Sequence, residues 1–219
     1  MLRVLGSLFA LLFLASLAAG GLGFYGYSVF TAEGPLAQNK IYMIDKGLST
    51  PEIAAKLKEQ GIIANAQLFT AGAYLTGERA RLKAGEYEFP AHASMQAVMA
   101  LIASGKSIIY KLSIPEGWTS QMAVDRINAN DVLTGDAVAT PAEGAVMPDT
   151  YVFHRGKTRQ QMLDDMLAAQ TKLVNELWMA HRASIPLKSP EEAVTLASIV
   201  EKETGKADER PLIASVFLN

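Results

Sequence analysis

Apolar and polar positions follow two patterns along the chain. Residues 4–30 are almost continuously apolar. Beyond them, short apolar runs of strand length alternate with segments whose apolar residues recur at helical spacing. The second pattern predicts strands at 41–45, 86–89 and 108–114, and helices at 51–59, at 65–75, and after Ser94, Thr119, Thr158 and Ser189. Short strands among many helices indicate an α+β protein.

The N-terminal apolar segment carries no charge between Arg3 and Glu33. Its length of about 27 residues exceeds the roughly 20 that span a bilayer as a helix. Tyr25 and Tyr27 lie near its far end, where aromatic rings suit the membrane interface. We therefore expect a transmembrane anchor with Arg3 on the cytoplasmic side. The alternative is a cleaved signal peptide, with residues 16–18 as a small-x-small cleavage site.

Four strand-to-helix junctions share one pattern, in which an apolar strand end is followed by a short turn and then Ser or Thr. The first and third junctions align at an offset of 70 residues, so that Gly47 matches Gly117. Glycine suits a turn that needs positive φ, and a Ser or Thr hydroxyl caps the first helical turn. In the first junction, Ser49 and Glu52 predict a capping box. The junctions are residues 44–49, 89–94, 114–119 and 153–158.

The first repeat predicts the order strand, helix, helix, strand over residues 39–110. This order resembles a LysM-like βααβ module, a type of fold that binds the glycan of peptidoglycan or chitin. Spacing alone favours the alternative of a compact α+β building block without sugar binding. Tyr87 and Trp118 are candidates for stacking on sugar rings or for core positions. We expect a flexible tether at residues 31–38 and a loop or lid at residues 129–150.

Composition excludes several kinds of chemistry. The chain has 20 basic and 22 acidic residues and a net charge of −2, which argues against binding nucleic acid through a basic surface. It has no cysteine, so a disulfide scaffold, a thiol nucleophile and a cysteine zinc site are ruled out. Its three histidines are scattered and suggest no metal site. Carboxylates, hydroxyls and backbone groups remain as candidates.

The most informative segment is SPEEAVTLASIVEKET at residues 189–204. Ser189 is a predicted N-cap, Pro190 occupies the first helical position, and Glu192 would complete a capping box. The run AVTLASIV between these signals is apolar or small on all sides, which predicts a largely buried helix. Glu201 follows directly after this run.

Glu201 shares one helical stripe with Val194, Ala197 and Thr204, whereas Glu203 points to another side. A carboxyl on an apolar, desolvated face favours its protonated form, which suits a general acid that protonates a glycosidic oxygen. The alternative is a structural ion pair, either Glu201 with Arg210 or Glu203 with Lys206.

These residues carry a resemblance to the endolytic murein transglycosylase (YceG-like) family. The similar stretches are IPEGWT at 114–119, MPDTY at 147–151, and LASIVEKET at 196–204 followed by ERPLIASVFLN. The resemblance implies that Glu201 is the catalytic glutamate. Glu203, Thr204 and Arg210 match the surrounding motif. The resemblance also implies a lytic reaction in which one glutamate cuts the β-1,4 bond after N-acetylmuramic acid, with no metal or organic cofactor.

The resemblance implies three parts: an anchor and tether at 1–38, a LysM-like domain at 39–110 and a catalytic domain at 111–219. The expected location is the bacterial cytoplasmic membrane, with a single span, a cytoplasmic N-terminus and the bulk of the chain outside. The expected partners are peptidoglycan strands, the membrane and peptidoglycan synthases. Because the apolar run LIASVFLN ends at Asn219, we expect an incomplete catalytic domain. The alternatives are a non-catalytic peptidoglycan-binding scaffold, an inactive fragment and a glycosidase that uses water.

Overall fold

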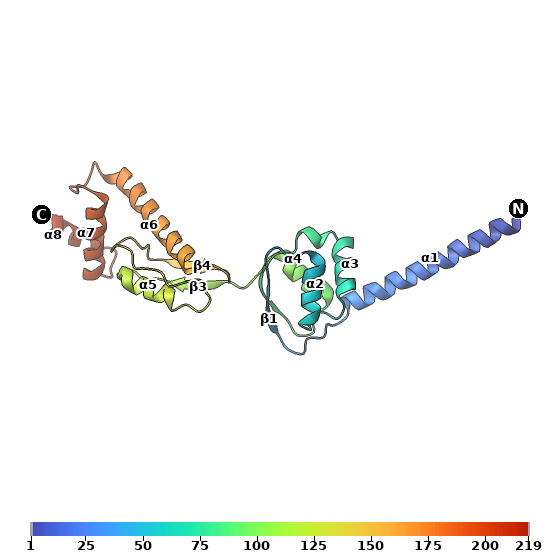
Figure 1. Ribbon diagram of the computed structural model, residues 1–219. Coiled ribbons are helices and arrows are strands. Elements are labelled where there is room, and N and C mark those ends of the chain that lie inside the picture. Colours follow the sequence, from blue (N-terminus) through green and yellow to red (C-terminus); the bar gives the residue numbers. More distant parts are fainter. Residues whose placement is uncertain (1, 219) are drawn as a thin grey trace. The chain divides into compact units, whose positions relative to one another are not determined.

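The computed structural model describes residues 2–218 and divides into two compact units (Figure 1). The proximal unit is Met1–Ile108 and the distal unit is Ile109–Asn219. The proximal unit contains α1 (Leu2–Thr31), β1 (Lys40–Ile44), α2 (Thr50–Glu59), α3 (Ala66–Leu75), the 3-10 helix η1 (Glu78–Ala80), β2 (Gly85–Phe89) and α4 (Met95–Ser104). The distal unit contains β3 (Tyr110–Ser113), α5 (Ser120–Asn128), β4 (Thr150–Phe153), α6 (Arg159–His181), α7 (Pro190–Glu203) and α8 (Arg210–Leu218). The mixture of helices and short strands confirms the α+β prediction.

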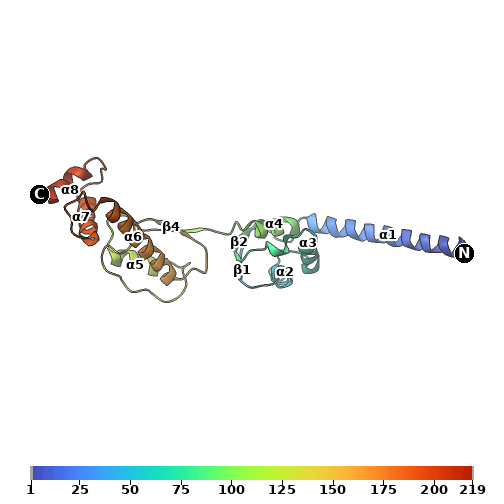
Figure 2. The same cartoon turned by 90° about the horizontal axis from the view of Figure 1, so that it is seen from above.

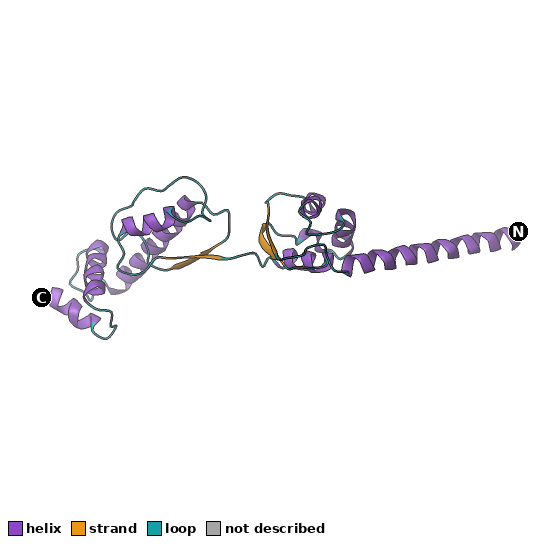
Figure 3. Cartoon of the chain, turned by 90° about the horizontal axis from the view of Figure 1, so that it is seen from below, coloured by secondary structure: helices purple, strands orange, loops and turns teal. Residues whose placement is uncertain are grey.

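Each unit has its own antiparallel strand pair, as the orange ribbons in Figure 3 show. In the proximal unit β1 pairs with β2, and Tyr42 lies opposite Tyr87. In the distal unit β3 pairs with β4, and Tyr110 lies opposite Phe153. Because a two-stranded sheet is marginally stable alone, each pair depends on the helices that pack against it.

Helix α1 extends away from the rest of the proximal unit (Figure 2). Its segment Leu11–Thr31 has a mean hydropathy of 1.4, and the side chains of residues 11–25 are exposed. An exposed apolar helix of this length can cross a bilayer. By length and composition, α1 therefore fits a single-pass membrane anchor.

The expectation of a flexible tether after α1 is wrong, because residues 31–38 are bound to the proximal unit. The Gly34 amide donates to the carbonyl of His92 at 3.1 Å, and the His92 amide donates to the carbonyl of Leu36 at 2.9 Å. Leu36 is buried. Before them, Phe30 packs so closely on Gly72 of α3 that a Cβ there would lie 2.6 Å from the ring.

The proximal core is formed where α2, α3 and α4 meet the β1–β2 pair. Its largest fully buried side chains are Ile44, Leu57, Ile62, Ile63, Phe69, Tyr87, Phe89 and Ile102. The chain order β1, α2, α3, β2 agrees with the predicted order of strand, helix, helix, strand.

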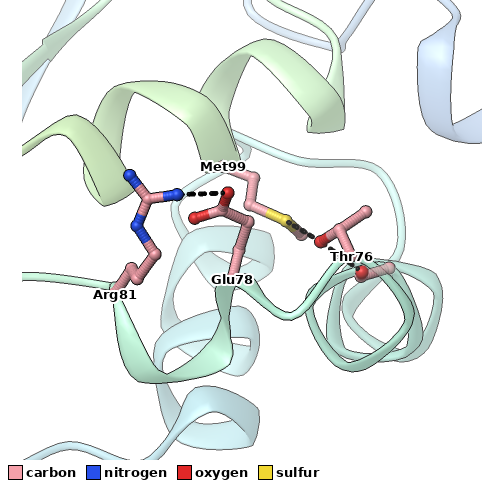
Figure 4. A network of polar contacts seen from close by, with 5 residues as sticks. Thr76, Glu78, Arg81 and Met99 are labelled. Carbon is pink, nitrogen blue, oxygen red and sulfur yellow. Dashed lines mark hydrogen bonds and ion pairs between the residues drawn. The ribbon is translucent and has the colours of Figure 1, made fainter.

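One polar contact joins the end of α3 to α4, and an ion pair lies at η1 (Figure 4). The Thr76 hydroxyl donates to the carbonyl of Gly72 at 2.8 Å and also contacts the sulfur of Met99 at 3.7 Å. Directly after η1, Arg81 Nη1 lies 2.9 Å from Oε1 of Glu78, the first residue of η1. Arg81 is largely exposed, so this ion pair contributes little to stability.

The distal core contains α5, the start of α6, the β3–β4 pair and the long connection between α5 and β4. This connection was expected to be a loop or lid at residues 129–150. It instead buries three apolar side chains, Leu133, Val138 and Val146. The Asn128 side chain donates from Nδ2 to the carbonyl of Val138 and accepts the Val138 amide at Oδ1, and Arg159 donates to the carbonyl of Gly135 at 2.7 Å. The prediction of a loop is confirmed, because no helix or strand lies between α5 and β4, but this loop is part of the core and the alternative of a lid is wrong.

All four predicted junctions form as capped turns. Positive φ occurs at the same place in each turn, at Gly47, His92, Gly117 and Gly156. The hydroxyls of the caps Ser94, Thr119 and Thr158 accept the amide three residues further on, at 3.1 to 3.2 Å. At the remaining cap, the Ser49 amide and hydroxyl both bind the Glu52 carboxylate.

The two units repeat one arrangement of strand, capped helix, strand and capped helix. Ile44, Ala54 and Leu57 correspond to the equally buried Ile114, Val124 and Ile127 at the offset of 70 residues. Phe89, Val98 and Ile102 correspond to Phe153, Met162 and Met166 at an offset of 64 residues. The offset changes because α3 and η1 of the proximal unit are replaced by the irregular connection in the distal unit.

Candidate active site

Helix α7 begins as the sequence indicates. The Ser189 hydroxyl accepts the Glu192 amide at 3.3 Å, with Pro190 in the first turn. The predicted capping box is wrong in one half, because Glu192 Oε2 accepts from the amide of Lys188, at 2.7 Å, rather than from Ser189. Hydrogen bonds to the Ser189 side chain and to the backbone lower the pKa of Glu191.

The expectation that α7 is largely buried is wrong. Among its residues only Val200 is buried, while Leu196 and Ile199 are half-buried. The helices α6 and α8 contact α7, and they cover only part of its surface. The apolar and small residues of α7 are explained by its contacts with α6 and α8 and by their place in the lining of an open cleft.

This cleft has a volume of about 710 Å³ and lies entirely within the distal unit. Val194, Ala197, Ser198 and Glu201 of α7 line one side. Val194, Ala197 and Glu201 belong to the stripe that the sequence indicates, and the small side chains of Ala197 and Ser198 leave room beside the Glu201 carboxyl. Thr204, the fourth residue of the predicted stripe, is buried elsewhere.

Glu201 is bound by Arg210. Arg210 Nη2 donates to Glu201 Oε2 at 3.0 Å, and the Glu201 side chain is 30% exposed. The structural ion pair considered from the sequence is thus present, and it occurs together with exposure of Glu201 to the cleft. The other pair considered is not formed among the described residues, since Lys206 Nζ binds Glu209 Oε1 at 2.9 Å instead of Glu203.

The turn between α7 and α8 is held by Thr204. Its buried hydroxyl donates to Glu209 Oε2 at 2.8 Å and accepts from the amide of Lys206 at 3.0 Å. Hydrogen bonds from Lys206 and Thr204 lower the pKa of Glu209. Arg210 follows directly as the first residue of α8, so the same turn places its side chain beside Glu201.

The opposite side of the cleft comes from the turn before α5 and from residues 142–148. Glu143 Oε2 accepts the Ser120 amide at 2.9 Å. Gln170 of α6 donates to the carbonyl of Gly144 at 2.8 Å. These bonds fix the wall of the cleft, a role that the sequence analysis did not assign to Glu143 or Gln170.

The two aromatic candidates are in different environments. Tyr87 is fully buried, and its hydroxyl donates to the carbonyl of Lys83 at 3.0 Å, so stacking on a sugar at Tyr87 is excluded. Trp118 is half-buried and lines the cleft. Trp118 therefore presents an apolar ring in the same cleft as Glu201.

The ionisable groups that line the cleft are Glu116, Glu143, Glu201 and Lys202. Within residues 2–218, no group of three or more potential metal-ligating side chains comes together. The cleft thus offers a carboxyl, an aromatic ring and small polar residues. A carboxyl in an open cleft beside an aromatic ring suits proton transfer to a bound ligand.

The chain belongs to the YceG-like family, which it matches over residues 42–219. The match includes residues 42–108 of the proximal unit and all of the distal unit, with the segment that carries Glu201. Membership confirms the resemblance seen in the sequence.

Curated relatives in this family are named endolytic murein transglycosylases. One from Streptococcus pneumoniae serotype 2 (strain D39) is 26% identical over 254 residues, which cover 95% of this chain and 46% of the relative. One from Bacillus subtilis (strain 168) is 23% identical over 237 residues, covering 93% of this chain and 65% of the relative. The chain thus spans about half the length of the streptococcal relative.

A solved structure is also similar. The crystal structure of a putative yceG-like protein from Listeria monocytogenes has 24% sequence identity and a TM-score of 0.41. The similarity covers 82% of this chain and 69% of the other.

Proposed function

We propose that the distal unit is an endolytic peptidoglycan transglycosylase. Its cleft would take a glycan strand and cut the β-1,4 bond between N-acetylmuramic acid and N-acetylglucosamine. Glu201 is the proposed catalytic residue. The observation that carries the proposal is that Glu201 lines a large cleft of the distal unit beside small residues of α7. Family membership and the names of the curated relatives support the same assignment.

One carboxyl group is enough for this reaction. Glu201 gives its proton to the glycosidic oxygen, and the bond from that oxygen to C1 of N-acetylmuramic acid breaks. The C6 hydroxyl of the same sugar then forms a bond to C1 and returns its proton to Glu201. The product ends in a 1,6-anhydro ring, no water is consumed, and Glu201 regains its starting state.

The intramolecular nucleophile removes the need for a second catalytic carboxylate, which ordinary glycosidases require. It also benefits from a high effective concentration. Glu143, another carboxylate at the cleft, already accepts a hydrogen bond from the Ser120 amide. We therefore assign Glu143 to the wall of the cleft.

The remaining parts of the chain are proposed to bring the cleft to its substrate. Helix α1 would anchor the protein in the bacterial cytoplasmic membrane with Arg3 inside, and residues 111–219 would act outside. Residues 39–110 would form a LysM-like glycan-binding domain. On the outer side of the membrane, the enzyme would end the elongation of nascent strands made by membrane-bound synthases.

The test is mass spectrometry of the products that the chain releases from peptidoglycan. We expect ends that are lighter by one water than hydrolysed ends, and a loss of turnover of about 10²- to 10⁴-fold in Glu201→Gln. Glu176→Gln, at an exposed position of α6, is the matched control and should keep full activity. Free reducing ends would indicate a water-using glycosidase. Binding to sacculi without products in either protein would indicate a scaffold.

A further inference from the structure

The two oxygens of the Glu201 carboxyl are held differently. Oε2 accepts the 3.0 Å hydrogen bond from Arg210 Nη2. For Oε1, residues 2–218 supply no hydrogen-bond or ion-pair partner. Among residues 2–218, only Oε2 thus has a partner.

Arg210 reaches Glu201 from outside the proposed substrate cleft. Glu201 lines both the large cleft and a second cavity of about 420 Å³. Arg210, Pro211 and Ala214 of α8 line the second cavity, and none of these three lines the large cleft. The guanidinium can therefore bind the carboxyl without occupying the space that a glycan would take.

We propose that Arg210 is a positioning residue, which fixes Oε2 so that Oε1 is the atom that exchanges the proton with the substrate. This inference rests on the proposed function of Glu201. It assigns separate roles to the two oxygens, a division that neither the family resemblance nor the names of the relatives supply.

The chemistry of the carboxyl allows Arg210 to stay bound throughout the reaction. When Oε1 carries the proton, Oε2 is a carbonyl-type oxygen and still accepts from Nη2. After Oε1 has given its proton to the glycosidic oxygen, Oε2 is part of the carboxylate and accepts the same bond. The direction of Oε1 is thus preserved between the first proton transfer and the return of the proton from the C6 hydroxyl.

Arg210 suits this role because its own position is fixed. The bonds of Thr204 with Glu209 and Lys206 hold the α7–α8 turn immediately before it. The planar guanidinium is also less adaptable than a lysine ammonium, so it restricts the orientation of its acceptor. The Arg210 side chain is 46% exposed, and an exposed ion pair contributes little to stability, so orientation is its main effect.

The test compares Arg210→Met and Arg210→Lys with the unchanged full chain. Methionine is long and unbranched and donates no hydrogen bond. We expect kcat to fall about 10- to 100-fold in Arg210→Met, as for loss of a hydrogen bond to a charged group. KM should change less than about twofold, because Arg210 does not line the cleft. The kcat of Arg210→Lys should lie between that of the unchanged chain and that of Arg210→Met. Added guanidinium ion should restore part of the kcat of Arg210→Ala.

Lys172→Met is the control, since Lys172 makes an exposed ion pair with Glu176 on α6 and lines neither cavity. It should leave kcat unchanged. Thermal unfolding of each variant checks that the fold is intact, and if Arg210→Met fails to fold, Arg210→Lys and the guanidinium rescue decide the question.

A second measurement does not depend on turnover. Crystal structures should show one Glu201 side-chain conformation in the unchanged chain and several in Arg210→Met. Full kcat in a folded Arg210→Met, or a single unchanged Glu201 conformation in it, would overturn the inference. Full turnover of Glu201→Gln, or none from the unchanged chain, would overturn the proposed function, whereas full kcat in Arg210→Met beside an inactive Glu201→Gln would overturn only the inference about Arg210.

Discussion

Gly144 lies so close to Val194 that a Cβ atom on the glycine would come within 2.7 Å of Val194 Cγ1. This contact joins the loop at residues 142–148 to α7, the helix that carries Glu201. The position of the proposed catalytic residue therefore depends on a glycine far away in the sequence.

The contact predicts that Gly144→Ala reduces activity more than a glycine-to-alanine change that only strains the backbone. Gly144 has a φ of +75°, and an added Cβ would also push against α7. Gly156→Ala is the matched control, because Gly156 has a φ of +95° with nothing within 4 Å of an added Cβ. We expect each variant to lose about 1–3 kcal/mol in urea unfolding, while only Gly144→Ala lowers kcat/KM. Equal kcat/KM in the two variants would contradict this prediction.

Trp118 should affect substrate binding more than the chemical step. Its ring lines the cleft, so Trp118→Ala removes an apolar surface from the proposed glycan site. We expect KM to rise about tenfold with little change in kcat, and Trp118→Phe to keep most of the affinity. Met179→Ala, at an exposed apolar residue of α6 that does not line the cleft, is the control and should keep the original KM. A fall in kcat alone would argue against a binding role.

Tyr151 makes the stability of the distal unit sensitive to alkaline pH. Burial, with smaller contributions from Asp149 and Asp165, raises the pKa of Tyr151 to about 12. The unfolded value is about 10, so this stabilisation is complete below pH about 10 and is lost as the pH rises towards 12. Chemical unfolding between these pH values should show a decreasing free energy of unfolding.

Tyr151→Phe should remove this contribution to the pH dependence. The variant also loses the hydrogen bond from the Tyr151 hydroxyl to the carbonyl of Met147, so it should be less stable at neutral pH. An alkaline decline as steep as that of the unchanged chain would show that another group causes it.

The capped turns were predictable because their determinants are local. A residue able to adopt positive φ, followed two residues later by Ser or Thr, specifies each turn within a few residues of sequence. The buried positions of the following helices, such as Leu57 and Ile127, follow from helical spacing. His92 shows the limit of this reasoning, since it adopts a φ of +58° where the other three turns use glycine.

The wall of the cleft could not be predicted, because it depends on contacts between distant segments. Residues 142–148 have no periodic pattern, and their place beside α7 results from the bonds of Glu143 and Gln170 and the close approach of Gly144. The exposure of α7 was missed for a related reason. Small and apolar residues are needed both in a core and beside a cleft, so composition alone does not separate the two.

The attachment of α1 also restricts movement of that helix relative to the folded residues after it. Phe30 packs on Gly72, and the backbone hydrogen bonds of Gly34 and Leu36 attach the following residues to the proximal unit. The end of α1 and the proximal unit therefore move together as one rigid body. In a bilayer that holds α1, any change in the inclination of the helix, for example with lipid thickness, would turn the β1–β2 pair through the same angle.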